Sequence, residues 1–176
     1  MRLKEISSEV FVADEPIVKV SCREIEFLKE RVKAAPRGRV RLCAHTDNED
    51  RLHEMIIVLS GQTYIRPHKH FQKSESFHII EGAVDVVILD DAGKIREVIQ
   101  MGALASGRQF YYRLSQPTYH TLLIRSELLV VHEITNGPFQ QNDALFAPWA
   151  PEEGSPAAAQ YLKQLDQSVA GFAAGV

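Results

Sequence analysis

The stretch GQTYIRPHKHFQKSESFHIIEG, which spans residues 61–82, decides the fold of this chain. Within it, one residue separates His68 from His70, and Glu75 follows after four intervening residues. Because residues i and i+2 of an extended strand point to the same face, we expect the two imidazoles side by side. A turn through residues 72–74 can bring the Glu75 carboxylate back toward them. Two neutral imidazoles and a carboxylate suit a divalent transition metal, so the stretch predicts a metal site with a further protein ligand elsewhere.

Around this stretch the sequence alternates short apolar runs with turn residues, which is the pattern of β-strands. Many short strands without helices between them favour an antiparallel sandwich or barrel over a parallel sheet. We expect Ser126-Glu127 to join the last two strands as a hairpin. The predicted strands are residues 10–13, 40–44, 54–59, 62–66, 76–80, 83–89, 95–99, 110–114, 119–124 and 128–134.

Two helices are predicted outside the strand-rich region. Ser21 with Glu24 three residues later is a capping-box pattern, and apolar residues recur at helical spacing over residues 22–34. Ser155 followed by Pro156 resembles a cap and first helical position, and an apolar stripe continues from there. The predicted division is an N-terminal strand and helix at 1–38, a β-barrel at 39–140 and a C-terminal extension with a helix at 141–176.

Composition and charge exclude several classes of function. The net charge is only −3, and no Lys/Arg cluster interleaves with aromatic residues, so we expect no nucleic-acid partner. The apolar runs are short and the N-terminus has no apolar signal core, which predicts a cytoplasmic protein without a membrane role. Cys22 and Cys43 are too few for a disulfide framework and are expected to be reduced.

The spacing His68-x-His70-x4-Glu75-x6-Gly82 resembles the first conserved motif of the cupin superfamily. In that superfamily two histidines and a glutamate bind a metal inside a small β-barrel. The resemblance implies an all-β fold, a cupin-type antiparallel β-barrel of the double-stranded β-helix or jelly-roll kind. With the two predicted helices, the barrel carries one helix at each end of the chain.

Residues 117–120, PTYH, resemble the second cupin motif and imply His120 as the fourth ligand. The segment departs from that motif because it lacks the glycine, is two residues shorter and has Ile124 where an asparagine is expected. Three histidines and one glutamate suit iron, manganese, zinc, nickel or cobalt, and the ligand types do not choose among them. We therefore expect one divalent transition metal per chain.

A longer resemblance covers residues 41–95, the HEITNGPF segment at 132–139 and the APWAP segment at 147–151. These segments are similar to the WbuC family of cupin-fold metalloproteins, which is associated with bacterial lipopolysaccharide O-antigen gene clusters. The resemblance implies a small-molecule substrate, a sugar or nucleotide sugar, and isomerase or epimerase chemistry in surface-polysaccharide biosynthesis. A non-catalytic binding protein and a metal-dependent dioxygenase are the alternatives. A barrel with added terminal segments also favours a homodimer.

Four more residues are candidates for the site. If His68 and His70 face the barrel interior, strand alternation places Tyr64 and Arg66 on the same face. Arg66 can then hold an anionic group of the substrate with two hydrogen bonds, or it forms an ordinary ion pair. In the expected hairpin, the loop length decides whether His132 or Glu133 shares the face of His120. That residue is a candidate general base or a partner that orients a liganding imidazole, and an exposed residue at the rim is the alternative. His45, His53 and His78 have no such geometry and are left out of the site.

Overall fold

The structure is a computed structural model that describes residues 1–140 and 143–174, so residues 141–142 and 175–176 of the predicted C-terminal extension lie outside it. The described residues contain two α-helices, one short 3-10 helix and twelve strands. In chain order these are β1 (Leu3–Ser7), β2 (Val10–Ala13), α1 (Cys22–Val32), β3 (Arg39–Cys43), β4 (Leu52–Ser60), β5 (His68–His70), β6 (Glu75–Glu81), β7 (Ala83–Leu89), β8 (Ile95–Gly102), η1 (Leu104–Ser106), β9 (Tyr111–Leu114), β10 (Tyr119–Ile124), β11 (Leu128–Asn136), β12 (Ala144–Phe146) and α2 (Pro156–Ala174).

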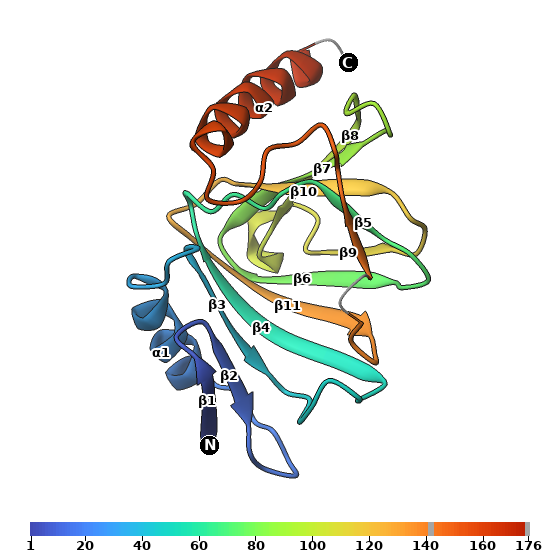
Figure 1. The fold of residues 1–176 in the computed structure, drawn as a ribbon. Helices are drawn as coiled ribbons and strands as arrows, with labels where there is room; N and C mark the ends of the chain where they lie inside the picture. Colours follow the sequence, from blue (N-terminus) through green and yellow to red (C-terminus); the bar gives the residue numbers. More distant parts are fainter. Residues whose placement is uncertain (141–142, 175–176) are drawn as a thin grey trace.

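The strands form two sheets that face each other (Figure 1). The larger sheet has the order β1-β2-β3-β4-β11-β6-β9, and the smaller has the order β12-β5-β10-β7-β8. Neighbouring strands are antiparallel within the described residues, apart from the parallel pair β2 and β3. The expectation of a mostly β, mostly antiparallel protein with two helices is confirmed.

The core between the sheets is made by side chains from both of them. Val86 of β7 and Val131 of β11 are fully buried in it. The next residue of β7, Val87, is equally buried but belongs to the opposite face, where α2 packs. Burial on both faces explains why β7 is a continuous apolar run rather than an alternating one.

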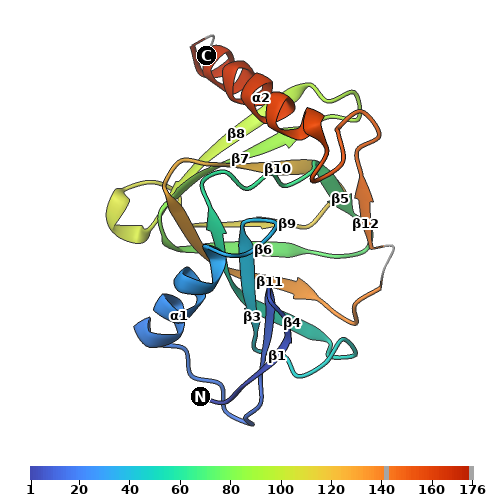
Figure 2. The same cartoon turned by 60° about the vertical axis from the view of Figure 1, so that its left-hand side comes forward.

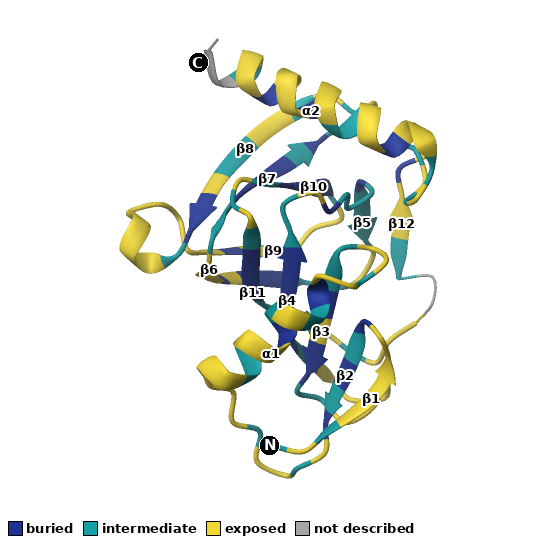
Figure 3. Ribbon diagram, turned by 90° about the vertical axis from the view of Figure 1, so that its left-hand side faces the viewer, coloured by how far each residue is buried: buried dark blue, intermediate teal, exposed yellow. Residues whose placement is uncertain are grey.

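Helix α1 covers the outer face of the larger sheet (Figure 3). Its predicted capping box is present: the Ser21 side chain accepts from the Arg23 amide, and the Glu24 carboxylate accepts from the Ser21 amide. Leu28 and Val32 point inward one turn apart, and each contributes about 1.5–3 kcal/mol by leaving water. Of the elements in residues 1–43, β1 alone was not predicted from the sequence.

Helix α2 covers the outer face of the smaller sheet (Figure 2). Leu165 and Val169 of its apolar stripe pack against that face. Arg125 links the helix to the sheet through ion pairs with Asp85 and Asp166. The helix starts at Pro156 as predicted.

Several local predictions are wrong. Residues 62–66 do not form a strand, because side chains take their backbone groups: the Thr121 hydroxyl donates to the Ile65 carbonyl. The hydroxyl of Ser155, predicted to cap α2, has no hydrogen-bond partner among the described residues. Strands β10 and β11 do not form a hairpin, since they lie in different sheets. Strand β12 was missed because three residues carry too little pattern to be recognised.

Candidate metal centre

The two sheets together bring His68, His70, Glu75 and His120 to one place. Strand β5 carries the first two, and His68 pairs directly with His120 of the neighbouring strand β10 in the smaller sheet. Glu75 begins β6 in the larger sheet and reaches across to them. The potential ligand atoms of the four residues all lie within 4.8 Å of one another, which is the spacing needed around a single ion.

Backbone carbonyls orient two of the imidazoles. His68 Nδ1 lies 2.9 Å from the Arg66 carbonyl oxygen, and His120 Nδ1 lies 3.0 Å from that of Thr118. A carbonyl can only accept, so each Nδ1 carries the hydrogen. In the neutral form of each ring the Nε2 then carries the lone pair that binds a metal, and the carbonyl holds the ring in place.

Glu75 is the buried anion of the cluster. One carboxylate oxygen lies 3.2 Å from His70 Nε2, and the other lies 3.3 Å from His120 Nε2. The Tyr112 hydroxyl donates to the carboxylate at 3.0 Å, to the same oxygen that lies near His120. These contacts hold the carboxylate in one orientation, toward the centre of the four side chains.

The pKa values of the cluster follow from burial and from these contacts. Burial alone raises the pKa of Glu75, but the charge and hydrogen bond of His120 outweigh it and hold this pKa well below the ordinary value. Burial lowers the pKa of His120, and Glu75 more than reverses that effect, so the net shift is upward. Burial and neighbouring His120 lower the pKa of His68 to about 4. His68 is therefore neutral at pH 7, the form that binds metal.

The donor set fits a transition metal. Three imidazoles and a carboxylate are the ligand types that zinc, iron, manganese, nickel and cobalt accept. In addition, the buried Nδ1 of His70 has no hydrogen-bond partner among the described residues. An unsatisfied buried polar atom of this kind indicates that an ion, water or ligand completes the site.

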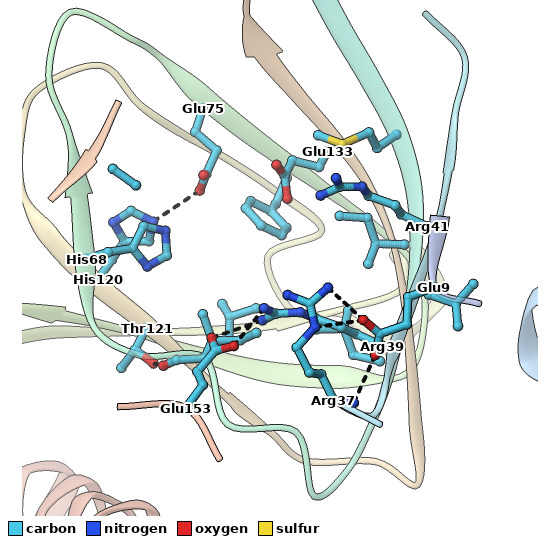
Figure 4. A pocket seen from close by; sticks show the side chains of 18 of the residues that line it. Glu9, Arg37, Arg39, Arg41, His68, Glu75, His120, Thr121, Glu133 and Glu153 are labelled. Carbon is cyan, nitrogen blue, oxygen red and sulfur yellow. Dashed lines mark hydrogen bonds and ion pairs between the residues drawn. The ribbon is translucent and has the colours of Figure 1, made fainter. Parts of the chain in front are cut away.

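The four side chains lie in the wall of a cavity of about 350 Å³ (Figure 4). Apolar side chains of both sheets make much of the remaining wall, and charged groups of β3, β11 and nearby loops line it as well. The apolar lining residues include Met55, Ile57, Leu59, Ile65, Phe77 and Leu122.

Of the dipeptide His132-Glu133, only Glu133 lines the cavity. It pairs with Phe77 of β6, so it shares the inner face of the larger sheet with Glu75, which lies two residues before Phe77. His132 is on the other face, 3.6 Å from the Glu54 carboxylate. One residue of the dipeptide therefore faces the interior, as predicted. The prediction assumed a hairpin between the strands of His120 and Glu133, and this hairpin does not form.

Burial and the negative charge of Glu75 raise the pKa of Glu133 to about 8, although Arg41 opposes the shift. Glu133 thus retains its proton at pH 7 in the metal-free protein. A carboxyl group with a pKa near neutrality can both donate and accept a proton under ordinary conditions.

A Glu133→Gln variant tests this shift through stability. In the metal-free wild type the folded carboxyl has a pKa of about 8, above its ordinary 4.5, so its stabilising contribution is complete below pH 4.5 and is lost as pH rises to 8. Glutamine does not titrate, so the variant should gain stability relative to the wild type over this range. Urea unfolding at about pH 5 and about pH 8 measures the difference, and an equal difference at both would contradict the raised pKa.

Tyr64 and Arg66 lie beside the cavity but do not line it. The Tyr64 hydroxyl donates to the Pro151 carbonyl, and Arg66 donates to the Ala147 carbonyl while its guanidinium lies over the Phe146 ring. Because residues 63–67 are not a strand, the alternation that linked these two side chains to the histidines does not apply. Their role in substrate binding stays a prediction.

The cavity wall also contains three arginines that were not among the predicted site residues, Arg37, Arg39 and Arg41. The signal was present as RGRVR at residues 37–41, where every second residue is an arginine. On β3 this spacing places Arg39 and Arg41 on one face, while Val40 turns to the core under α1. Arg37 precedes the strand.

Comparisons with known proteins identify proteins with a similar fold, but they do not indicate a reaction for this chain. A family model described as a domain of unknown function (DUF6016) matches residues 21–101. A search of curated proteins gave no significant match. No helix in residues 1–140 and 143–174 has the length and apolar character needed to span a membrane.

Among solved structures, protein SO0799 from Shewanella oneidensis is similar with a TM-score of 0.54 and 12% identity, over 73% of this chain and 85% of that one. An oxalate decarboxylase from Bacillus subtilis has a TM-score of 0.44 and 17% identity, over 55% of this chain and 24% of that one. Procruciferin, an 11S globulin from Brassica napus, has a TM-score of 0.42 and 14% identity, over 54% of this chain and 22% of that one. The chain therefore has the two-sheet fold of SO0799, and its resemblance to the WbuC family stays a prediction.

Proposed function

We propose that this chain is a cupin-type metalloprotein that binds one divalent transition metal through His68, His70, Glu75 and His120. One observation carries the proposal: four side chains from two sheets direct their ligand atoms to within 4.8 Å of one another at the wall of a cavity. In a five- or six-coordinate ion, four protein ligands leave coordination positions for an oxygen of a small molecule. The site is then suited to chemistry on a molecule that enters the cavity.

We propose further that this molecule is a sugar or nucleotide sugar and that the reaction is of isomerase or epimerase type, as the WbuC resemblance implies. A bound metal would supply polarisation of a carbonyl or hydroxyl oxygen. Such a reaction also needs a group that moves a proton, and Glu133 lines the same cavity with a pKa of about 8. We therefore assign the proton transfer to Glu133 rather than to His132. The homodimer stays a prediction.

Metal content is the direct test. Untagged wild-type protein should contain about one transition-metal ion per chain by elemental mass spectrometry, and a His68→Ala, His70→Ala double variant should contain less than about a tenth of that. The fold should survive because the core between the sheets does not include these residues. Full metal content in the double variant would contradict the assignment.

The matched control is His78→Ala. His78 is an exposed histidine of β6, a few residues after Glu75, and it does not line the cavity. Its removal should leave the metal content unchanged. Once metal-loaded protein is available, sugars, sugar phosphates and nucleotide sugars are incubated with it, and an isomerised product that disappears on chelation supports the proposed reaction. Recovery of the sugars unchanged would favour a binding protein instead.

A further inference from the structure

The cavity has a second polar end, opposite the metal ligands. Across the larger sheet the strands follow the order β3-β4-β11-β6, so Arg41 on β3 is separated from Glu75 on β6 by two strands. At ordinary strand spacing β3 and β6 lie about 14 Å apart across the sheet. Along the strands the register leads from Arg41 through Ile57 and Val131 to Ile79, four residues beyond Glu75, so the two residues lie farther apart than the strand spacing alone. Figure 4 shows the histidines on one side of the cavity and the Arg41 guanidinium on the other, directed toward the interior and toward Glu133.

Two of the three arginines in the wall are already neutralised. Arg37 forms an ion pair with Glu9 at 2.6 Å, and its backbone amide also donates to that carboxylate. Arg39 binds Glu153 with two hydrogen bonds, of 3.2 and 2.8 Å. The Arg39 pair has the fork geometry that carboxylates and guanidinium groups prefer, whereas two guanidinium nitrogens of Arg37 contact a single oxygen of Glu9. Both arginines are thus already paired with carboxylates of the wall.

Arg41 is different. No carboxylate of the described residues lies within 4.0 Å of its guanidinium. The nearest acidic side chain of the wall in Figure 4 is Glu133, whose ionised form is disfavoured by burial and by Glu75. The Arg41 side chain is exposed to solvent, so an anion that enters the cavity can reach it, and the lining residues Ile57 and Met55 beside it are apolar and offer no competing hydrogen-bond partner.

The size of the cavity limits what this anion can be. A volume of about 350 Å³ is at the low end of the roughly 300–1,000 Å³ of small-molecule pockets. A molecule of monosaccharide size fills such a space, whereas a whole nucleotide sugar exceeds it. The occupant must also present an oxygen to the metal ligands at the other end.

We propose that Arg41 is the anion-binding end of this cavity and that the molecule bound there is a monosaccharide-sized carboxylate or phosphate, with a second oxygen at the His68, His70, Glu75 and His120 site. This inference rests on the proposed function and narrows its substrate class. The guanidinium holds the anionic group by two parallel hydrogen bonds, and the distance between the two ends selects the length of the molecule.

Calorimetric titration of the metal-loaded protein, in a buffer without phosphate, tests the proposal with three probes. Gluconate carries a carboxylate, glucose 1-phosphate carries a phosphate, and glucose carries neither. At least one anion should bind about tenfold or more tighter than glucose, and Arg41→Gln should remove that advantage. The two anionic probes distinguish a sugar acid from a sugar phosphate.

Two further variants make the result specific. Arg96→Gln removes an exposed arginine of β8 that pairs with Asp90, and it should bind the anions as the wild type does. Arg41→Lys keeps the positive charge but loses the two parallel hydrogen bonds of a guanidinium, so it should retain part of the preference for anions over glucose. Equal affinity for anions and glucose, or undiminished anion binding by Arg41→Gln, would overturn the proposal. Metal content measured on the same samples reports separately on the proposed function, because Arg41 is not a metal ligand.

Discussion

Replacing His120 with alanine should reduce the bound metal to less than about a tenth of the wild-type content. His120 is the one ligand that comes from β10, and it lies beside His68 and against Glu75. Without it, the remaining three ligands leave one side of the ion without protein. The same change should abolish the rise in melting temperature on adding metal, which for wild type at a hundred times Kd corresponds to about 2.7 kcal/mol.

The variant also leaves the buried Glu75 without one partner, and loss of a buried partner can itself cost about 3–5 kcal/mol. His120→Gln is therefore made in parallel, since its amide can still donate to the carboxylate. Both variants should lose metal. His132→Ala should retain it, because His132 lies on the face of β11 that points away from the cavity, next to Glu54. If His120→Gln folds and keeps its full metal content, the fourth ligand has been assigned wrongly.

Gly82→Val should destabilise the fold by about 3 kcal/mol or more. Gly82 has a φ of +90°, in the left-handed region that costs an L-residue about 1–2 kcal/mol. A Cβ there would clash with the Leu128 carbonyl oxygen and would lie 2.5 Å from Ser126 Oγ. The carbonyl belongs to β11 in the middle of the larger sheet, so it cannot move aside without breaking strand pairing.

A pair of alanine variants separates the two causes. Gly107 also has a positive φ, of +75°, but a Cβ there meets nothing within 4 Å. Gly107→Ala should lose only about 1–2 kcal/mol, the cost of the backbone conformation, while Gly82→Ala should lose clearly more. Urea unfolding of both variants gives the comparison. Similar losses at the two glycines would show that crowding at Leu128 has no effect.

The sequence alone determined those features whose interacting residues lie close together in the chain. The alternation of His68 and His70 and the short insert before Glu75 predicted three clustered side chains, and strand periodicity works within a few residues. The capping box of Ser21 and Glu24 predicted the start of α1 in the same way, because a cap and its partner are neighbours in the chain. For the same reason the apolar stripe of α2 was recognised before any packing was known.

Only the tertiary structure decided the pairing of strands and therefore the contents of the cavity. Residues 62–66 have a strand-like composition, yet hydrogen bonds from distant residues such as Thr121 take their backbone groups. Ser126 and Glu127 look like a hairpin turn, but β10 and β11 separate into facing sheets, which is a choice of partner rather than of local conformation. That choice places Glu133 and Arg41 in one cavity with His120. Hydrogen bonding and burial between residues far apart in the chain decide such contacts, and no short window of sequence contains both partners.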